Sequence, residues 1–543
     1  MTGPEERIFT LFPEPGNIPE SFRMHKPLDQ RSILINGEIR SWEGPVNPVV
    51  SPIGLRSKDG EIILIPIGSY PLGTEKEAKE ALEAAYQAYN QGRGEWPTMT
   101  VQDRIHHIEN FTYKMIEKKK EIVQLILWEI GKSFEDSEKE FDRTVEYIYA
   151  TIEALKKSDN NSSKFEIVDG IAGQIRRAPL GVVLCMGPFN YPLNETFTTL
   201  IPALIMGNTV LFKPPKHGTL LFAPLLEAFR DSFPKGVVNT IYGRGGNVVP
   251  GLMSSGKVDV LALIGSSKVA DQLIKLHPKT NRLRSILSLD AKNQAIVLKD
   301  ADLDNAVKEC VLGALSFNGQ RCTAIKIIFV HQSIAEDFLK KLAIEVNKLP
   351  LGMPWEKGVK ITPLPEPNKP NYIKEVIEQA IHFGARVVNE GGGLTVSTLV
   401  QPAIIYPVDE RMKLYREEQF GPIIPVVPFE SIEEPLEYLI NSDHGQQVSI
   451  FGKNHGEIAQ LIDPVVNLVC RVNINSQCQR GPDVFPFTGR KDSAEGTLSV
   501  ADALRSFSIR SMVAAKLTSM NKEILNEIMH ENESKFLNTR FIF

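Results

Sequence analysis

The alternation of hydrophobic and polar positions divides the chain into a helical first part and a later part in which strands and helices take turns. Between residues 75 and 158, apolar residues recur at helical spacing, which predicts long amphipathic helices. Residues 165–177 alternate between apolar and polar and contain Gly170 and Gly173, a pattern that indicates a β-ribbon. Residues 1–55, rich in proline, glycine and charge, are expected to form an extended lead-in.

From residue 180 the pattern becomes one of short apolar runs separated by helical segments. This alternation is typical of a doubly wound α/β domain, and a second α/β rhythm runs from about 302 to 475. Near the end, residues 522–536 place apolar side chains on one helical face, which predicts a docking helix. The strands predicted after residue 180 are 182–186, 209–212, 237–241, 258–264 and 294–298.

The composition is that of an ordinary soluble globular protein. Of its 543 residues, 42% are hydrophobic and 23% are charged, with a formal net charge of −5, which argues against nucleic acid as a partner. No apolar stretch is as long as a membrane span, and the first residues lack the layout of a signal peptide. The cysteines are few, odd in number and without zinc-site spacing, so we expect no metal and a reducing, cytoplasmic location. They are Cys185, Cys310, Cys322, Cys470 and Cys478.

Cys322 lies in the segment Phe-Asn-Gly-Gln-Arg-Cys-Thr-Ala, the most informative stretch of the chain. A cysteine is a strong nucleophile only as a thiolate, and its pKa falls near a cation. Arg321 is covalently adjacent and Gly319 leaves room on the approach side, so Cys322 is a candidate nucleophile. Taken alone, the motif fits a buried, unreactive cysteine better. The other motifs of the chain decide between these two interpretations.

A phosphate site is predicted at Gly265 and Ser266, between the strand ending at 264 and the helix expected over 268–276. Free backbone N–H groups and the helix dipole there suit a pyrophosphate, although such a turn is more often a simple helix cap. Residues 251–257 match part of a P-loop, but Val258 stands where Ser or Thr should hold Mg²⁺ and a strand follows, so we reject that match.

Four further loops carry candidate groups, each with a plainer alternative. The amide of Asn190 follows a buried strand and suits a developing oxyanion, or is a turn asparagine. Lys213 and Lys216 end the next strand, where an anionic cofactor binds in open α/β sheets, or form a solvated strand end. Glu418 can hold a ribose, and Arg480 lies in a Pro/Gly loop suited to a phosphate or carboxylate.

Together these segments resemble the aldehyde dehydrogenase superfamily over roughly residues 30–515. Within it, the chain is most similar to the non-phosphorylating, NADP-dependent glyceraldehyde-3-phosphate dehydrogenases. The motifs that carry the resemblance are Pro-Phe-Asn190-Tyr191-Pro, Lys-Pro-Pro-Lys216, Gly-Gln-Arg321-Cys322-Thr, Gln-Arg480-Gly-Pro-Asp and Phe-Pro-Phe487.

The resemblance implies an α/β aldehyde dehydrogenase-like fold with a Rossmann-like cofactor domain, an α/β catalytic domain and a β-ribbon for oligomerisation. It also implies a homo-oligomer, either a dimer or a tetramer. The boundaries we expect are a lead-in over 1–55, a cofactor domain over 56–293 interrupted by the ribbon at about 163–179, a catalytic domain over 294–485, a return to the cofactor domain with an oligomerisation strand over 486–516, and a helical tail over 517–543.

The implied reaction is the oxidation of an aldehyde, with glyceraldehyde 3-phosphate as the expected substrate and 3-phosphoglycerate as product. By resemblance, Cys322 attacks the aldehyde, Asn190 and the Cys322 N–H hold the oxyanion, and hydride passes to NADP, with NAD a weaker cofactor. Lys216 stands where NAD-preferring relatives often carry a glutamate, and an ammonium there attracts a 2′-phosphate. The implied cofactor residues are Lys213, Lys216, Gly265, Ser266, Glu418 and Phe420, and the substrate-phosphate residues are Tyr191, Arg143, Arg321 and Arg480, with a surface ion pair as the alternative for Arg143.

One departure from the family pattern affects the last step. The family's Leu-Glu-Leu-Gly-Gly-Lys reads here Leu-Ser-Leu-Asp-Ala-Lys, so Ser288 stands at the position of the water-activating glutamate. A serine hydroxyl is no base near pH 7. Asp290, two residues on, would face the same side of a strand, displaced by roughly 6–7 Å, and is the substitute we consider. Thioester hydrolysis is in doubt, whereas acylation and hydride transfer are not.

Three hypotheses stay open on the sequence alone. The first is a hydrolytic NADP-linked dehydrogenase of a phosphorylated aldehyde. The second is a CoA-acylating or other semialdehyde dehydrogenase, for which a missing base is tolerable. The third is a catalytically impaired relative that keeps the fold as a binding protein. Cys322, Asn190 and Glu418 argue against the third, and the arginines favour the first over the second.

Overall fold

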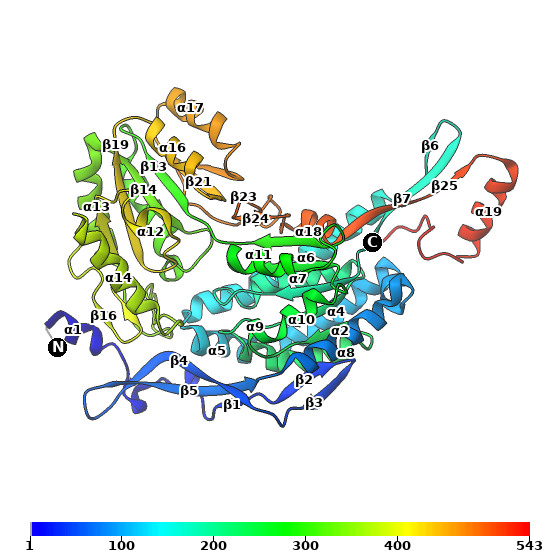
Figure 1. The fold of residues 1–543 in the computed structure, drawn as a ribbon, viewed down its shortest axis with the longest axis horizontal. Helices are drawn as coiled ribbons and strands as arrows, with labels where there is room; N and C mark the ends of the chain where they lie inside the picture. The colour runs from blue at the N-terminus through cyan, green and yellow to red at the C-terminus, as the bar shows by residue number, and fades with distance from the viewer. Residues whose placement is uncertain (1–2) are drawn as a thin grey trace.

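The computed structural model describes residues 3–543 and arranges most of them around two parallel β-sheets (Figure 1). The first sheet has six strands in the order β10-β9-β8-β11-β12-β24. Its parallel strands are mostly buried on both faces, which is why they appear as continuous apolar runs in the sequence. The strands are β8 (Val182–Met186), β9 (Thr209–Lys213), β10 (Val238–Thr240), β11 (Val260–Ile264), β12 (Arg284–Ser288) and the antiparallel β24 (Ala494–Glu495).

Helices pack around this sheet and confirm the helical periodicity predicted for residues 75–158. A cluster of phenylalanines joins them: the rings of Phe111 and Phe229 lie 4.5 Å apart and Phe197 packs 5.9 Å from Phe111. The helices are α2 (Glu75–Tyr89), α4 (Val101–Glu117), α5 (Lys119–Ile130), α6 (Phe134–Asn161), α7 (Asn194–Ile205), α8 (Leu226–Ser232) and α11 (Ser267–Leu276).

The second sheet forms the other α/β body, the upper left of Figure 1, with the strand order β15-β18-β19-β14-β13-β21-β22. Its central strands β13, β14 and β21 are parallel neighbours. The strands are β13 (Asn293–Val297), β14 (Ile325–His331), β15 (Arg386–Val387), β18 (Ala403–Tyr406), β19 (Ile423–Phe429), β21 (Gln447–Phe451) and β22 (Arg471–Ile474). The helices around it are α12 (Leu303–Leu315), α13 (Ala335–Asn347), α14 (Lys369–His382), α16 (Glu433–Asn441) and α17 (His455–Val465).

The first 55 residues are more ordered than the extended lead-in we expected. A short helix is followed by a hairpin whose turn, Asn36-Gly37, has φ values of 53° and 73°. An Asn-Gly pair between apolar runs is a strong hairpin signal that the composition of the segment concealed. The elements are α1 (Gly3–Phe9), β1 (Leu28–Asp29), the hairpin β2 (Ser32–Ile35) and β3 (Glu38–Ser41), and β4 (Val46–Arg56), which pairs with β5 (Ile62–Pro71).

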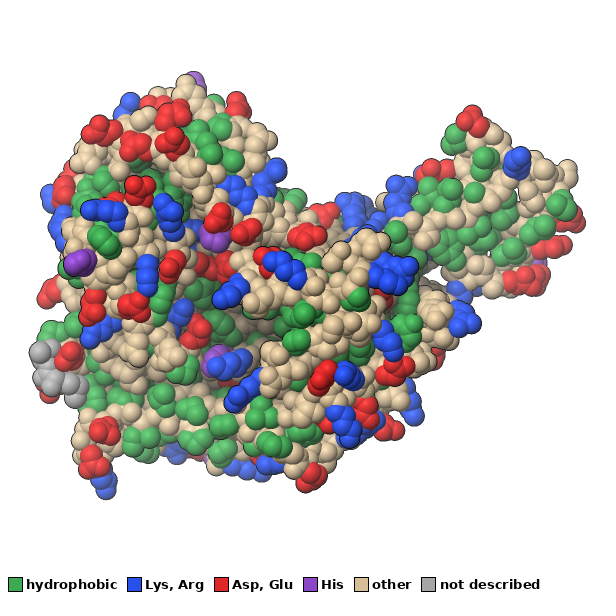
Figure 2. Space-filling view, viewed as in Figure 1, with side chains coloured by type: hydrophobic (Ala, Val, Ile, Leu, Met, Phe, Trp, Pro, Cys, Tyr) green, Lys and Arg blue, Asp and Glu red, His purple; other side chains and the backbone are tan. Residues whose placement is uncertain are grey.

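A three-stranded ribbon projects from the body, at the right of Figures 1 and 2, and confirms the strand pattern predicted around residues 165–177. It comprises β6 (Glu166–Val168), β7 (Ile171–Pro179) and β25 (Ser508–Lys516). Apolar side chains gather on its surface in Figure 2, and Ile167, Val168 and Met512 are each more than 60% exposed. Within the described residues, no helix is long and apolar enough to cross a membrane.

The end of the chain differs from the predicted docking helix. Helix α19 (Ser519–His530) forms, but it contains no buried residue, so its apolar face does not dock on the body of this chain. The segment that follows it returns instead to the base of the ribbon. There Leu537 is buried, and Asn538 exchanges two hydrogen bonds with the side chain of Gln174 on β7.

Candidate active site

A cavity of about 560 Å³ is lined by residues from both α/β bodies, at the ends of their strands. It brings together most of the side chains predicted from the sequence. They are Arg143, Asn190, Tyr191, Gly265, Ser266, Ser288, Asp290, Arg321, Cys322, Glu418, Phe420 and Arg480. Lys213 and Lys216 instead line an adjoining cavity of about 310 Å³, which shares Phe189 and Glu366 with the first.

Cys322 is held between α12 and β14 by a tight turn over Ser316–Gly319. Gly319 has φ +71°, and a Cβ there would lie 2.7 Å from the backbone oxygens of Ala314 and Gly421, so this position requires glycine. The carbonyl of Cys322 accepts hydrogen bonds from Asn293 Nδ2 (2.8 Å) and Lys326 Nζ (3.1 Å). Cys322, the candidate nucleophile, is therefore fixed by residues at the start of the central strands β13 and β14.

The surroundings of Cys322 favour the protonated form of its thiol. Burial raises its pKa to about 11, and the carboxylate of Glu195 raises it further, whereas Lys326 and Arg480 lower it. The expectation that Arg321 is the cation that activates the thiol is wrong. Its guanidinium turns back to donate to the carbonyls of Leu312 (3.3 Å) and Gly313 (2.8 Å) on α12.

A buried ion pair positions the Asn190 loop. Lys132 is paired with Glu140, and its ammonium donates to the Asn190 carbonyl at 2.7 Å. The other oxygen of Glu140 accepts the backbone N–H groups of Leu193 and Asn194 at the start of α7. Asn190 itself donates one amide hydrogen to the Gln320 carbonyl (2.8 Å), beside Cys322. Because an amide nitrogen carries two hydrogens, one remains for a ligand.

Sequence analysis did not identify Lys132 and Glu140, because two charged residues eight positions apart carry no signal of mutual burial. Only the fold shows that both side chains are fully buried. A buried charge is stable only when it is paired, so the pair is a strong constraint on the loop that carries Asn190.

Of the three arginines that line the cavity, Arg143 and Arg480 are paired with carboxylates, whereas Arg321 donates only to backbone carbonyls. Arg143 forms a two-pronged ion pair with Asp483 (3.0 and 2.7 Å), which is the alternative considered for it. Arg480 is hydrogen-bonded to Glu195, and its Nε lies 3.3 Å from Asp483. The predicted arginine cage is thus largely neutralised before any substrate enters.

Glu195 is the main residue that sequence analysis missed. It lies in the first turn of α7, a helix that is otherwise entirely uncharged and buried, and it lines the cavity with Cys322. A single acidic residue in an otherwise uncharged helix is the signal that was available, since such a group is rarely buried without a function or a partner.

Asp290 does not share a strand face with Ser288. Strand β12 ends at Ser288, so Asp290 lies in the loop that follows and the two-residue periodicity no longer applies. Its carboxylate accepts hydrogen bonds from the backbone N–H and the hydroxyl of Ser267, both at 2.8 Å, at the first turn of α11. The side chain is engaged as a helix cap rather than free beside the thiol.

On the cofactor side of the cavity, Lys213 and Lys216 form no ion pair with a carboxylate of residues 3–543. Burial lowers the pKa of Lys213 to about 8, and its ammonium donates to the Pro214 carbonyl at 3.2 Å. A bound anion would offset the free-energy cost of burying the charged ammonium of Lys213. Ser266 caps α11 from the same side, and Glu418 is paired with Lys326 at 2.9 Å. These groups fit a phosphate-bearing dinucleotide. Asp290 is the exception, because its carboxylate is already bound at the first turn of α11.

Comparison with known proteins decides the family. A model described as the aldehyde dehydrogenase family matches residues 65–513. The chain belongs to the aldehyde dehydrogenase family. This membership confirms the resemblance and the α/β fold predicted from the motifs.

Relatives of this aldehyde dehydrogenase include enzymes for different aldehydes. An NADP-dependent glyceraldehyde-3-phosphate dehydrogenase of Streptococcus equinus is 33% identical over 466 residues, which is 83% of this chain and 92% of the relative. A malonate-semialdehyde dehydrogenase of Bacillus pumilus is 28% identical over 457 residues, again 83% of this chain and 92% of the relative.

Solved structures share the fold over most of this aldehyde dehydrogenase. The NADP-dependent glyceraldehyde-3-phosphate dehydrogenase of Bacillus halodurans C-125, complexed with NADP, has a TM-score of 0.81 and 29% identity, covering 90% of this chain and all of that one (100%). Lactaldehyde dehydrogenase of Escherichia coli has a TM-score of 0.81 and 25% identity, with the same coverage.

Proposed function

We propose that this aldehyde dehydrogenase oxidises a phosphorylated aldehyde, with glyceraldehyde 3-phosphate as the candidate substrate, to the carboxylic acid with NADP. The observation that carries the proposal is the grouping of Cys322, Asn190 and the guanidinium groups of Arg143 and Arg480 in one cavity. The names of the similar proteins support the same substrate and cofactor. We also propose that the enzyme acts as a homo-oligomer in the cytoplasm.

In the proposed reaction, the Cys322 thiol loses its proton to solvent, and the resulting thiolate attacks the aldehyde carbon and forms a thiohemiacetal oxyanion. The free amide hydrogen of Asn190 and the backbone N–H of Cys322 would donate to the oxyanion. Bound NADP supplies the hydride acceptor, and Cys322 is then left as a thioester. The Lys132–Glu140 pair keeps the Asn190 loop in place and so acts as a positioning pair. Water releases the acid and restores the thiol.

For the cofactor, we propose that Lys213 and Lys216 hold the 2′-phosphate of NADP and that Glu418 and Phe420 hold the nicotinamide ribose end. Gly265 and Ser266 would meet the pyrophosphate. The support is the adjoining cavity at Lys213 and Lys216, together with the buried ammonium of Lys213, whose lowered pKa reflects an uncompensated charge.

Deacylation is the weak point of the proposed cycle. Ser288 is no base, and Asp290 is engaged by Ser267. The remaining carboxylates of the cavity are each paired with a cation: Glu195 with Arg480, Glu366 with Lys369 and Glu418 with Lys326. We therefore propose that hydrolysis of the thioester limits turnover.

A rapid-mixing experiment with glyceraldehyde 3-phosphate and NADP tests the proposal. The expected trace is a burst of NADPH, stoichiometric with sites, followed by a slower steady state. A trace without a burst, at enzyme concentrations that would reveal one, contradicts the limiting deacylation. No NADPH at all contradicts the substrate. The same experiment is repeated with added CoA. A faster steady state with an acyl-CoA product would favour the CoA-acylating alternative.

A second candidate substrate is a semialdehyde that carries one carboxylate. It is favoured by the pairing of Arg480 with Glu195 and of Arg143 with Asp483, which leaves less positive charge for a phosphate dianion. Comparing kcat/KM for glyceraldehyde 3-phosphate, glyceraldehyde and malonate semialdehyde separates the two. Equal values for glyceraldehyde and its 3-phosphate would remove the phosphate proposal.

A further inference from the structure

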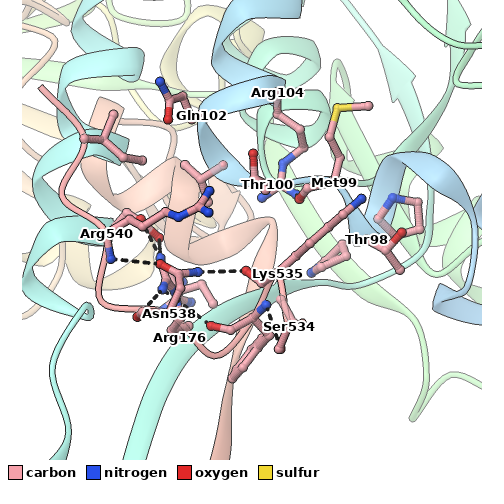
Figure 3. A pocket seen from close by; sticks show the side chains of 18 of the residues that line it. Thr98, Met99, Thr100, Gln102, Arg104, Arg176, Ser534, Lys535, Asn538 and Arg540 are labelled. Atoms are coloured by element: carbon pink, nitrogen blue, oxygen red, sulfur yellow. Dashed lines mark hydrogen bonds and ion pairs between the residues drawn. The ribbon is translucent and has the colours of Figure 1, made fainter. Parts of the chain in front are cut away.

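A second large cavity, of about 540 Å³, lies at the base of the ribbon. One wall is the start of α4 with the residues before it, the second is the end of β7, and the third is the C-terminal segment 532–542 (Figure 3). We call it the tail cavity. None of its lining residues lines the active-site cavity, so the two are separate sites.

Two arginines of the tail cavity are bound only to neutral oxygens. Arg104 is buried and donates to the carbonyls of Ile205 (2.8 Å) and Met99 (2.5 Å). Arg177 donates to the hydroxyl of Ser508 (2.6 Å) and to backbone carbonyls. Burial lowers the pKa of Arg104 to about 10, and it lowers the pKa of Arg177 as well. Neither guanidinium forms an ion pair with a described residue.

The tail adds two further cations. Figure 3 shows Lys535 and Arg540 around the same space as Arg104, coming from the two ends of the tail. Within residues 3–543, neither forms an ion pair with a carboxylate. The lining contains two carboxylates: Asp159 is already bound to Arg176 (2.5 and 2.6 Å), and Glu533 is exposed. Four cations therefore face one unpaired acid.

The tail is fixed in place by specific hydrogen bonds, so this wall is preorganised. Asn160 on α6 exchanges two hydrogen bonds with the backbone of Ile542 (2.7 and 2.8 Å), and Gln174 does the same with Asn538 (2.6 and 3.2 Å). Arg176 also donates to the carbonyl of Asn538 at 3.1 Å. The tail lies outside the segment 65–513 that matches the family, so the tail cavity depends on an extension of this chain.

We propose that the tail cavity binds a phosphate-bearing small molecule. The buried guanidinium of Arg104 and the half-buried one of Arg177 have no counter-charge, which favours an anion, and arginine forks match phosphate oxygens in geometry. The volume is close to that of the active-site cavity, enough for a small organic phosphate. The N-terminal turn of α4, at Thr100 and Val101, adds the positive end of a 17-residue helix on the same wall.

Calorimetric titration of the full chain tests the site, with inorganic pyrophosphate and AMP as the two phosphate probes and adenosine as the uncharged comparison. We expect pyrophosphate, AMP or both to bind, and adenosine not to bind. The double variant Lys535→Glu, Arg540→Glu should weaken that binding by at least about tenfold, since it replaces two attractive charges by repulsive ones. If only pyrophosphate binding is weakened, the tail cavity takes an inorganic phosphate. If AMP binding is weakened, it takes a phosphate ester.

The matched control is Lys522→Glu, a charge reversal on exposed α19 outside the cavity, which should leave the titration unchanged. Arg177→Gln, with the tail intact, should also weaken binding, so the test does not depend on one variant. Basal dehydrogenase activity should persist in all of them. The proposal is overturned if wild type binds no probe at millimolar concentration or if the double variant binds as wild type does. It is equally overturned if loss of binding accompanies a changed oligomeric state, because a second copy would then cover the cavity.

Discussion

The active-site cavity and the tail cavity have similar volumes, about 560 and 540 Å³, but different charge balances: acids and cations are equal in number around the first, and cations outnumber acids around the second. In the active-site cavity, Arg480 is bound to Glu195 and Arg143 to Asp483. In the tail cavity, the guanidinium groups of Arg104 and Arg177 are bound to neutral oxygens. The number of arginines around a cavity therefore says little about the anion it will hold until their partners are known.

The difference has a physical origin. Fully buried charges are costly unless they are paired, and Glu195 and Arg480 are both almost fully buried. In the tail cavity, Lys535 and Arg540 are exposed, and water stabilises their charges. A ligand in the active-site cavity must compete with built-in carboxylates, whereas one in the tail cavity would replace water.

The largest expected effect is the loss of dehydrogenase activity when Cys322 in the active-site cavity is replaced, with no change in ligand binding at the tail cavity. Cys322→Ser should lower dehydrogenase activity by at least about 10³-fold, because Cys322 is the proposed nucleophile and an alcohol lacks the low pKa of a thiol. NADP binding and pyrophosphate binding to the tail cavity should not change. The measurement is steady-state NADPH formation beside calorimetry, with exposed Cys470→Ser as the control that keeps activity. Substantial activity in the Cys322 variant would refute the assignment.

The second prediction concerns pH and the acidic surroundings of the thiol. The pKa of Cys322 is raised to about 11, so the thiolate fraction and the alkylation rate should rise about tenfold per pH unit between pH 7 and 10. The direction follows because the protonated thiol predominates below its pKa. The alkylation rate is measured by mass spectrometry of the Cys322 peptide after iodoacetamide treatment. A rate that levels off near pH 8 would mean that the neighbouring cations outweigh burial and Glu195.

The third prediction adds a carboxylate without a cationic partner to the active-site cavity. Ser288→Glu should speed the steady-state phase after the NADPH burst by about 10²-fold, the lower end of general-base contributions. Ser288→Ala is the control and should leave that phase unchanged. Asp290→Asn should also have little effect, because Asp290 is held by Ser267. A large slowing in the Asp290 variant would show that it serves as the base after all.

The fourth prediction makes the active-site cavity resemble the tail cavity. Glu195→Gln keeps the size of the side chain and removes the charge that neutralises Arg480, so kcat/KM for glyceraldehyde 3-phosphate relative to glyceraldehyde should rise about tenfold. It should also shift the alkylation profile of Cys322 to lower pH, because Glu195 raises the pKa of the thiol. An unchanged substrate ratio would contradict a role for Glu195 in selecting the anion.

The smallest expected effect concerns the cofactor side. Lys216→Glu should lower the preference for NADP over NAD by about five- to tenfold, because an exposed carboxylate repels the 2′-phosphate. Dissociation constants for both cofactors at equal salt provide the measurement, and Lys235→Glu, away from that cavity, is the control. If wild type binds NAD at least as tightly as NADP, the role of Lys216 is wrong.

Local pattern was enough to predict much of the fold. The strands at 182–186, 209–212 and 260–264 were visible as apolar runs because both faces of a parallel sheet are covered. The ordered elements of the lead-in were missed because the Asn36-Gly37 turn is a two-residue signal inside a segment rich in proline, glycine and charge. The tail was misjudged because the apolar face of α19 does not reveal whether this chain or another surface covers it.

By itself, the sequence determined the family, and through the resemblance to that family it predicted that Cys322, Asn190 and Arg480 share one site, although they come from both α/β bodies. Only the tertiary structure decided the electrostatics. It brought Glu195 to Arg480, Asp290 to Ser267, and the tail to Arg104 and Arg177. These partners lie on different elements, and a charge acts through distance and burial, which residue order along the chain does not encode.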